Sequence, residues 1–362
     1  MPGTAAGRDA TAGGHIDQID AVRGIAALLV ACVWHVYFLT GGRRTGPLDG
    51  WQPFTWLHDY GWTLVDLFFV VSGWIFSHVY LEQGRLKGSV RAFARARIAR
   101  LYPLHLATLL LMAALVPWGT PPSLDYAAND AWHFGLNLAM LQDVGLDTNL
   151  SFNIPAWSLS IELICYAAFV GLAVAGGKIQ RFAPYLLIVA GALATLPEDR
   201  SFDHLARGLT GFFVGALVWR FRQGLGRIYS LVLVGIIGAV LWFPLPTPII
   251  NLGTYYSLVL WPSVVLLVLR IPALGWAPMR WLGERSYSIY LLHVPTYWAL
   301  SVFVFAGRAV PANIAPFVMV ASWVIVLAAA DLSYRHFECP ARRWVRQWRK
   351  PAPRRPNRLP RA

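Results

Sequence analysis

Residues 20–35 read Asp20-Ala21-Val22-Arg23-Gly24-Ile25-Ala26-Ala27-Leu28-Leu29-Val30-Ala31-Cys32-Val33-Trp34-His35, an apolar stretch that contains one Arg and ends on one His. An ionisable side chain at the centre of a bilayer costs about 2.5 kcal/mol or more, so it normally faces a polar cavity or a partner instead of lipid. The stretch therefore predicts a transmembrane helix with a functional side that faces the interior of a helix bundle instead of lipid. His35 is the first candidate for chemistry in this chain.

The composition extends this prediction to the whole chain. Of 362 residues, 57% are hydrophobic and 14% are charged, whereas soluble domains have about 25% charged residues. The 17 Trp and 14 Tyr side chains also fit a membrane protein, where such rings gather at the interfaces. We expect an all-α, polytopic membrane domain over 23–340, with a long external loop at 117–156. A polar tail (1–22) precedes it and a basic, Pro-containing tail (341–362) follows it.

Hydrophobic segments predict about ten transmembrane helices, at roughly 24–40, 61–80, 99–116, 157–175, 184–196, 205–219, 228–243, 253–269, 286–306 and 314–331. With a cytoplasmic N-terminus, 26 of the 31 Lys and Arg side chains fall in the inner segments and four in the outer ones, while Arg207 lies within a span. Because cytoplasmic loops are enriched in Lys and Arg, this split favours ten spans with both termini inside. The net charge of +13 is thus explained by membrane topology and contact with membrane lipids, and we predict no nucleic-acid partner.

Ionisable residues of three predicted helices meet at one level of the membrane. His35 lies twelve residues beyond Arg23, or about 18 Å along a helix, in the outer half. Asp66 and Glu162 reach the same half on helices that run inward. A carboxylate beside an imidazole can orient it and raise its basicity, as a general base for a hydroxyl requires. The alternative is that each residue only pairs one helix with another.

Two arginines precede the third span on the cytoplasmic side. Arg97 and Arg100 are three residues apart and share a helix face, so their guanidinium groups could clamp phosphate oxygens. Ordinary positive-inside charge and lipid contact would explain them equally well. We find no Walker-type loop and no paired Cys/His spacing, so we predict no metal.

A third set opens the ninth span. Tyr287, Tyr290 and His293 are spaced by three residues and share one face. That face should look into the bundle. Helix packing explains this pattern about as often as a binding site does.

The chain resembles the acyltransferase-3 family of bacterial integral-membrane O-acyltransferases over about 16–345. The resemblance rests on stretches that follow one another in the family's order: Arg23-Gly24 through His35, Asp66-Leu67-Phe68-Phe69-Val70-Val71-Ser72-Gly73, Arg97-Ile98-Ala99-Arg100-Leu101-Tyr102-Pro103, Trp157-Ser158-Leu159-Ser160-Ile161-Glu162, Ser286-Tyr287-Ser288-Ile289-Tyr290-Leu291-Leu292-His293, and Glu338 with Pro340. Each stretch alone is weakly specific, and their common order makes the set specific.

The resemblance implies a multi-pass enzyme of the bacterial cytoplasmic (inner) membrane. It implies a cytoplasmic acyl-CoA donor, usually acetyl-CoA, which is a substrate and not a permanently bound cofactor. It implies a carbohydrate hydroxyl as acceptor, including one still carried on a lipid. We expect His35 as general base with Asp66 and Glu162 in support, Arg23, Arg97 and Arg100 at the donor, and Ser72, Trp157, Ser158, Tyr287, Tyr290 and His293 at the substrate.

One spacing departs from the family's usual pattern. The usual first motif has ten residues between Arg and His, and here there are eleven. Eleven steps of 100° return to within about 20° of the start, whereas twelve steps end about 120° away. Either the helix carries a π-bulge, as functional helices sometimes do, or Arg23 and His35 point in different directions.

Other functions and one other mechanism stay open. A transporter also places His, Asp and Glu in a membrane as a proton relay, although it often shows an internal repeat, and none is evident here. An enzyme of the same family could instead acylate a small glycosylated metabolite. A covalent acyl-enzyme through Ser72 or Ser158 is the alternative mechanism.

Overall fold

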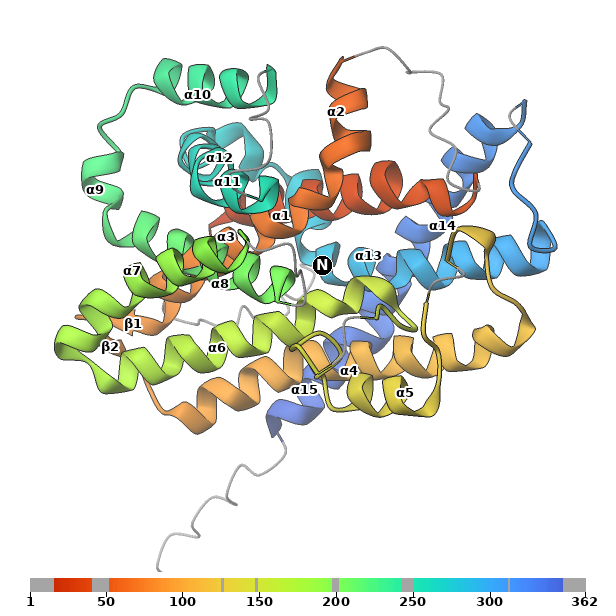
Figure 1. The fold of residues 1–362 in the computed structure, drawn as a ribbon, viewed down its shortest axis with the longest axis horizontal. Helices are drawn as coiled ribbons and strands as arrows, with labels where there is room; N and C mark the ends of the chain where they lie inside the picture. The colour runs from red at the N-terminus through yellow and green to blue at the C-terminus, as the bar shows by residue number, and fades with distance from the viewer. Residues whose placement is uncertain are drawn as a thin grey trace, which may run out of the picture.

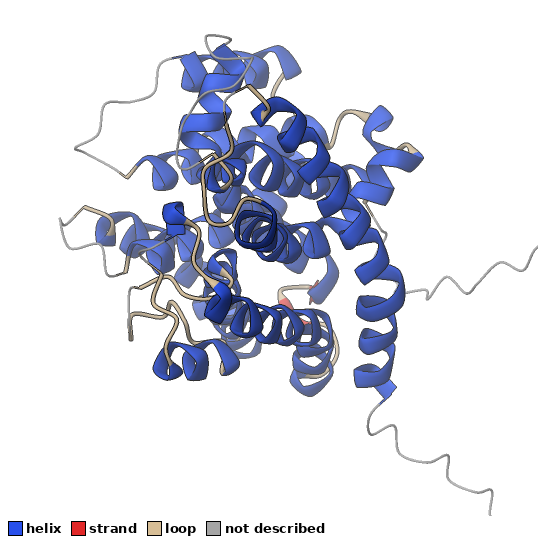
Figure 2. Ribbon diagram, turned by 90° about the vertical axis from the view of Figure 1, so that its right-hand side faces the viewer, coloured by secondary structure: helices blue, strands red, loops and turns tan. Residues whose placement is uncertain are grey.

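The computed structural model describes residues 16–40, 52–124, 127–146, 149–196, 202–242, 251–311 and 313–347. Within these residues the chain is almost entirely helical, and the helices pack side by side in one bundle (Figures 1 and 2). The sheet among them is one antiparallel hairpin of β1 (Leu81–Glu82) and β2 (Arg85–Leu86). The all-α prediction is confirmed. The outer parts of both predicted tails, 1–15 and 348–362, lie outside the described residues.

The longer helices are α1 (Asp17–Leu29), α3 (Leu64–Tyr80), α4 (Val90–Leu115), α6 (Trp157–Ala175), α7 (Gly177–Ala194), α8 (Asp203–Arg220), α10 (Ser230–Trp242), α13 (Ala277–Ala299) and α14 (Ala315–Ser333). The shorter ones are α2 (Gln52–Tyr60), α5 (Ala131–Leu138), α9 (Arg222–Leu225), α11 (Leu252–Leu258), α12 (Leu260–Val268) and α15 (Cys339–Gln347). Turns of π-helix extend α1, α13 and α14 at Val30–Trp34, Leu300–Val304 and Tyr334–Glu338. Turns of 3-10 helix occupy His35–Phe38, Gly61–Thr63, Val116–Trp118, Pro122–Leu124, Ile154–Ala156 and Pro272–Gly275.

Every expected span overlaps one of these helices. Four helical stretches in the described residues are long and apolar enough to cross a membrane: Thr55–Tyr80, Val90–Trp118, Ile154–Ala175 and Ala315–Val345. Shorter apolar helices lie at Ser230–Trp242 and Leu252–Val268. These helices support an integral membrane protein. The count of about ten spans stays a prediction, because a helix perpendicular to the bilayer needs about 20 residues to cross it.

The expected single span at 253–269 is interrupted. It consists of α11 and α12, which meet at Val259. Pro262 lies in the first turn of α12, and a proline has no N–H to bond the carbonyl four residues earlier, that of Leu258. This lost bond explains why one helix ends there and another begins.

The helix that carries Arg97 and Arg100 begins earlier than the expected span. The side chain of Ser89 accepts a hydrogen bond at 3.2 Å from the backbone N–H of Ala92, and this N-cap starts α4 at Val90. Both arginines therefore lie on a regular helix and not in a loop.

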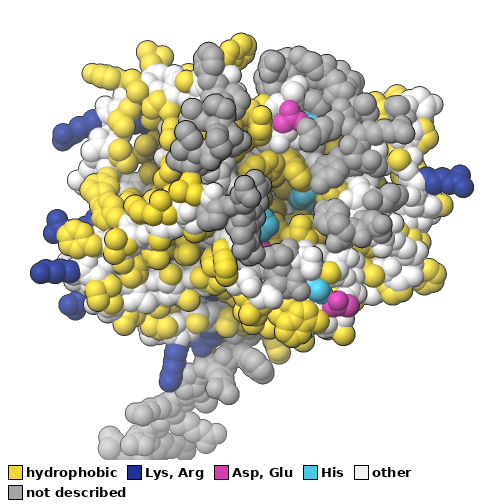
Figure 3. All heavy atoms as spheres, in the orientation of Figure 1, with side chains coloured by type: hydrophobic (Ala, Val, Ile, Leu, Met, Phe, Trp, Pro, Cys, Tyr) yellow, Lys and Arg dark blue, Asp and Glu magenta, His cyan; other side chains and the backbone are white. Residues whose placement is uncertain are grey.

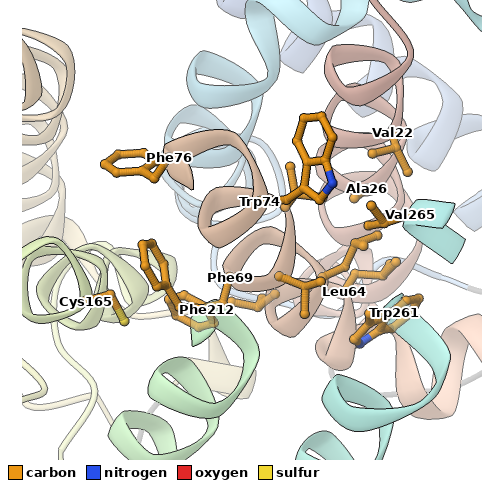
Figure 4. Packing of buried hydrophobic residues seen from close by; sticks show 14 of the residues in the cluster. Val22, Ala26, Leu64, Phe69, Trp74, Phe76, Cys165, Phe212, Trp261 and Val265 are labelled. Atoms are coloured by element: carbon orange, nitrogen blue, oxygen red, sulfur yellow. The ribbon is translucent and has the colours of Figure 1, made fainter. Parts of the chain in front are cut away.

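The larger of two hydrophobic clusters is organised around α3, whose side chains contact helices on several sides (Figure 4). Trp74 lies toward Val22 of α1, while Phe76 lies beside Phe212 of α8, with 5.8 Å between the ring centroids. On the α12 side, Trp261 belongs to the same cluster. Aromatic packing thus fixes α3 between α1, α8 and α12.

Close approach of α3 and α8 depends on small residues. A Cβ on Gly73 would lie 1.8 Å from the carbonyl oxygen of Phe212, and one on Gly215 would lie 1.9 Å from that of Val70. Small residues let helix backbones approach in this way inside membranes. The contact holds Asp66 of α3 against Arg207 of α8.

The bundle has a basic end. On the face in Figure 3, the Lys and Arg side chains gather mainly at the left edge, where Figure 1 places β1, β2 and the turn between α6 and α7. Hydrophobic side chains are spread over much of the described surface of that face. The distribution fits a bundle whose long axis crosses a bilayer, with one end facing anionic headgroups.

Candidate active site

A π-helical turn separates Arg23 from His35. Residues Val30–Trp34 form this turn directly after α1, and His35 follows it. Because a π turn closes i to i+5, it takes in one residue more than an α turn. The turn thus accommodates the eleventh residue of the spacing and brings His35 back toward the side of α1 that carries Arg23. Of the two alternatives for the spacing, the π-bulge is the one observed.

His35 is hydrogen-bonded to a second histidine. Its Nδ1 lies 2.7 Å from Nε2 of His293 on α13, and the two ring planes are within 18° of parallel. His35 is 9% exposed and His293 is fully buried. Nδ1 of His293 lies 3.2 Å from the carbonyl oxygen of Ile289, which can only accept. His293 therefore donates from Nδ1 and accepts at Nε2, and in the neutral ring this leaves the lone pair of His35 on Nε2.

His35 lines a cavity on the side of the bundle away from the basic end. This histidine cavity has an empty volume of about 720 Å³, part of it open to the exterior. Its walls are largely aromatic and include three tryptophans, with two further polar groups, His204 and Arg207: the wall residues are Val30, Trp34, His35, Phe38, Trp62, Val65, Leu150, Ile154, Trp157, His204, Arg207 and Tyr290. An apolar pocket with a few converging polar groups is the usual form of a small-molecule site.

A narrower space lies between the histidine cavity and the basic end. This central slot, of about 490 Å³, is lined by Arg23, Val65, Phe68, Phe69, Ser72, Ser158, Leu159, Glu162, Ser286, Tyr287 and Tyr290. Glu162 accepts hydrogen bonds there from Ser72, at 3.3 Å, and from the hydroxyl of Tyr166. Its observed partners are thus hydroxyl groups. It lies in the slot between Arg23 and the histidine cavity.

Hydroxyl groups form the other wall of the slot. Ser158 Oγ lies 3.0 Å from the Tyr290 hydroxyl, and both hydroxyls donate to the carbonyl of Pro155. The hydroxyl of Tyr287 donates to the carbonyl of Leu101 at 2.6 Å. These bonds fix Tyr287 and Tyr290 of α13 as wall residues. The expected face of α13 therefore does look into the bundle.

The third space opens at the basic end. This basic cavity, of about 1350 Å³, is lined by Ile16, Ile19, Asp20, Arg23, Trp74, Ile75, His78, Val79, Tyr80, Arg97, Arg100, Gly283, Glu284, Tyr287, Tyr334, Glu338 and Arg342. Arg97 is held in place by a 2.7 Å hydrogen bond to the Tyr80 hydroxyl and by the face of Phe76, 5.0 Å away. Arg100 is half-buried and lines this cavity together with Glu338.

The three cavities follow one another through shared walls. Arg23 and Tyr287 line both the basic cavity and the central slot. Val65 and Tyr290 line both the slot and the histidine cavity. Three adjacent spaces therefore lie between the arginines at the basic end and His35. The structure brings His35 and His293 together at one end and Arg23, Arg97 and Arg100 at the other.

A family model described as an acyltransferase domain matches residues 16–332. The chain belongs to the acyltransferase-3 family. Membership confirms the resemblance seen in the sequence and makes the chain an acyltransferase. No solved structure matches the chain.

Three curated relatives of this acyltransferase differ in how much of the chain they match. Two peptidoglycan O-acetyltransferases, OatA of Listeria monocytogenes and the putative YrhL of Bacillus subtilis, are 23% and 25% identical over 91% and 80% of this chain. The chain spans about half of their length, 56% and 51%. Protein 2 in the picA locus of Rhizobium radiobacter is 31% identical over 42% of this chain and 78% of its own length.

Asp66 forms an ion pair with another helix in this acyltransferase. Pairing of helices was one of the two roles expected for it, the other being support of His35. Nε and Nη2 of Arg207 donate to its two oxygens at 3.1 and 2.8 Å, and both side chains are buried. The guanidinium also lies 4.4 Å from the ring centroid of Trp62. Asp66 thus contributes to the wall of the histidine cavity through Arg207.

Sequence patterns did not single out Arg207 and His204 as candidate site residues. Arg207 is a lone cation within a predicted span, and the reasoning applied to His35 holds for it equally. His204 stacks on Trp157 with 4.0 Å between ring centroids, and its Nδ1 lies 2.8 Å from Asp143, in the segment between α5 and α6. Nothing in the sequence joined His204 to Asp143, which is 61 residues away.

The segment between α4 and α6 contains the short helix α5. Asp130 caps α5, and hydrogen bonds from the backbone amide and the imidazole of His133 hold the pKa of its carboxyl below the usual range. Among the residues placed in the structure, no cluster of three or more His, Cys, Asp or Glu side chains could hold a metal ion.

Proposed function

We propose that this chain transfers an acetyl group from acetyl-CoA to a carbohydrate hydroxyl within the bacterial inner membrane. The observation that supports the proposal most strongly is the series of cavities that joins the arginine cluster to the histidine pair. Family membership gives the reaction class, and the names of two relatives give the class of acceptor. The acceptor is a glycan of the cell envelope or a secreted glycan, including one carried on a lipid.

The donor enters from the basic end, which positive-inside topology makes cytoplasmic. Arg97, Arg100 and Arg23 bind its phosphates, since guanidinium groups bind phosphate oxygens by paired, charge-assisted hydrogen bonds. The pantetheine arm extends through the central slot, past Tyr287 and Tyr290. The thioester then lies at the boundary of the slot and the histidine cavity.

The chemistry takes place at Nε2 of His35. This nitrogen takes the proton of the acceptor hydroxyl, and the oxygen attacks the thioester carbonyl. The C–S bond breaks, and an ester forms on the acceptor. CoA leaves as a thiolate, and the proton from the hydroxyl stays on the imidazolium of His35. His293 maintains the tautomer that leaves the lone pair of His35 on Nε2. Direct transfer needs no acyl-enzyme, and both Ser72 and Ser158 are engaged in hydrogen bonds.

The acceptor sugar binds in the histidine cavity. Sugar rings present C–H faces that pack on indole rings, and Trp34, Trp62 and Trp157 line this space. Because the charge of Arg207 is neutralised by Asp66, the cavity favours an uncharged part of the glycan. This side of the bundle faces away from the cytoplasm in the proposed topology.

Sidedness of donor use tests the proposal. Acetyl-CoA labelled in the acetyl group is supplied to inverted inner-membrane vesicles and to right-side-out vesicles that contain the chain. We expect labelled glycan only in the inverted vesicles, where the basic end faces the donor. Label in the right-side-out vesicles alone, or no transfer from any acyl-CoA to glycan in either, would refute it.

A further inference from the structure

A fourth cavity lies outside the series that joins the arginines to the histidines. This groove lies between α3, α6, α7 and α8 and has an empty volume of about 610 Å³, part of it open to the exterior. It is lined by Ser77, Leu81, Phe169, Leu172, Ala173, Gln180, Pro184, Phe213, Ala216, Leu217, Trp219 and Arg220. None of these residues lines the histidine cavity, the central slot or the basic cavity.

The groove is polar at one end and apolar along the rest. Ser77 is near the end of α3, Gln180 is in the first turn of α7 and Arg220 ends α8, so all three lie at the basic end of the bundle. The apolar residues lie farther from the basic end. Phe169 precedes the end of α6, Phe213 precedes the end of α8, and Pro184 follows the first turn of α7. This gradient matches a lipid with its headgroup at the basic end and a chain in the groove.

The positive charge at the polar end of the groove favours a negatively charged headgroup. Arg220 is half-buried, and its Nη1 donates to the backbone carbonyl of Arg181 at 3.0 Å. None of the residues lining the groove is acidic, so no lining carboxylate neutralises this guanidinium. Arg181 itself adds a second cation close by. Basic pockets between transmembrane helices on the cytoplasmic side are suited to anionic lipid headgroups.

An unpaired hydroxyl lies on the wall of the same groove. Ser77 is fully buried, and its Oγ has no hydrogen-bond partner among the residues that the structure describes. A buried hydroxyl without a partner is unfavourable, so such groups usually meet an acceptor. An ester oxygen just below a phosphate headgroup is such an acceptor.

We infer that this groove binds one molecule of an anionic phospholipid from the leaflet at the basic end. The phosphate pairs with Arg220, the ester region lies beside Ser77 and Gln180, and one acyl chain packs along Phe169 and Phe213. The orientation rests on the same topology as the proposed function, but lipid binding requires no acyl transfer. The site therefore stabilises the α3–α8 pair from the side opposite α1.

Lipid-dependent stability of the full chain tests the inference. The chain is purified in mild detergent and stripped of lipid, and its melting temperature is followed as phosphatidylglycerol, phosphatidylcholine or glycerol phosphate is added. We expect phosphatidylglycerol to raise the melting temperature most, phosphatidylcholine to raise it less and glycerol phosphate to have no effect. Equal shifts with both lipids, or a shift with glycerol phosphate alone, would overturn the assignment.

Variants localise the effect to the groove. Arg220→Gln should weaken phosphatidylglycerol binding about five-fold, since one Arg near anionic headgroups contributes about 1 kcal/mol. Leu217→Trp should abolish binding by filling the groove. Arg227→Gln, an exposed cation at the same end but outside the groove, is the matched control and should bind as wild type does.

Bound lipid, counted by native mass spectrometry, provides a second readout. We expect one retained phosphatidylglycerol on the wild type and on Arg227→Gln, and fewer on the other two variants. Equal retention by all four proteins would contradict the site. Because neither readout involves acetyl-CoA, a failure of acetyl transfer and a failure of lipid binding are separate results.

Discussion

The histidine pair is the most informative contact at the scale of residues. His293 donates to the Ile289 carbonyl and accepts from His35, which leaves Nε2 of His35 as the basic nitrogen. A carboxylate was the expected partner of His35, yet Asp66 is bonded to Arg207 and Glu162 to Ser72 and Tyr166. A second imidazole here fixes a tautomer without adding a negative charge to the membrane interior.

His293 is therefore predicted to act as a positioning residue. His293→Leu should lower kcat for acetyl transfer at least about 100-fold, because loss of the correct tautomer disables a histidine base. The KM for acetyl-CoA should stay near the wild-type value, since the arginines are untouched. His293→Gln, whose amide oxygen can accept from Nδ1 of His35, should recover part of kcat. Steady-state kinetics in proteoliposomes measure both parameters, and wild-type kcat in the Leu variant would refute this role.

Arg97 and Arg100 are predicted to affect donor binding and not chemistry. Arg97→Gln and Arg100→Gln should each raise the KM for acetyl-CoA by about ten-fold or more, since a hydrogen bond to a charged group contributes about 1.5–3 kcal/mol. Arg95→Gln is the matched control, because Arg95 lies on the same helix but is exposed. An equal effect of all three substitutions would mean that general positive charge, and not the cavity, attracts the donor.

The Asp66–Arg207 pair is predicted to be structural. Asp66→Ala should lower the free energy of unfolding by about 3 kcal/mol, because the buried guanidinium of Arg207 then keeps only Asp203, whose Oδ2 lies 3.7 Å from Nη1. The double variant Asp66→Ala with Arg207→Leu should recover much of that loss. Thermal unfolding in detergent compares the three proteins. A double variant less stable than either single variant would contradict the explanation.

Among the secondary-structure elements, the π turn at Val30–Trp34 matters most for the site, because it lies between Arg23 and His35. The turn is consistent with the eleven residues between Arg23 and His35, a spacing that left two alternatives, a π turn or divergent side chains. Spacing alone could not decide between them, because the contacts that stabilise the turn come from distant segments. One of these is the hydrogen bond from the Tyr297 hydroxyl to the Ala31 carbonyl, at 2.8 Å.

Changing the length of this turn tests its purpose. Deletion of Val33, which is half-buried, should convert the turn to α-helix and leave ten residues between Arg23 and His35. Because that spacing also places both on one face, we expect substantial activity to remain. Insertion of one Ala after Val33 should rotate His35 by about 100° and abolish activity. Acetyl transfer by folded deletion and insertion variants gives the comparison, and an inactive deletion with an active insertion would contradict it.

Sequence patterns predicted the elements better than their boundaries. Hydrophobic runs located helices at all ten segments, since burial in lipid requires long apolar stretches. They did not reveal the break at Val259 or the early start of α4 at Ser89, which depend on one proline and one capping hydroxyl. They also could not show that α3 and α8 pack through Gly73 and Gly215, because pairing of distant helices leaves no local pattern.

At the scale of the whole molecule, charge distribution predicts orientation. Cysteines at Lys87 and Leu146 would place one exposed label at the hairpin end and one on the outer loop, in a chain whose native cysteines are replaced by serine. A membrane-impermeant maleimide should label Leu146→Cys in intact spheroplasts and Lys87→Cys only in inverted vesicles. The reverse pattern would place the basic cavity on the outside and remove the proposed route for the donor.

His35 is the proposed base, next to the spaces that would hold acetyl-CoA. The most direct test is transfer of labelled acetyl groups into glycan by inverted vesicles that contain wild type, His35→Ala or His336→Ala, an exposed histidine that serves as control. We expect label with wild type and His336→Ala, and at least about 100-fold less with folded, equally expressed His35→Ala. Equal label in all three would contradict it.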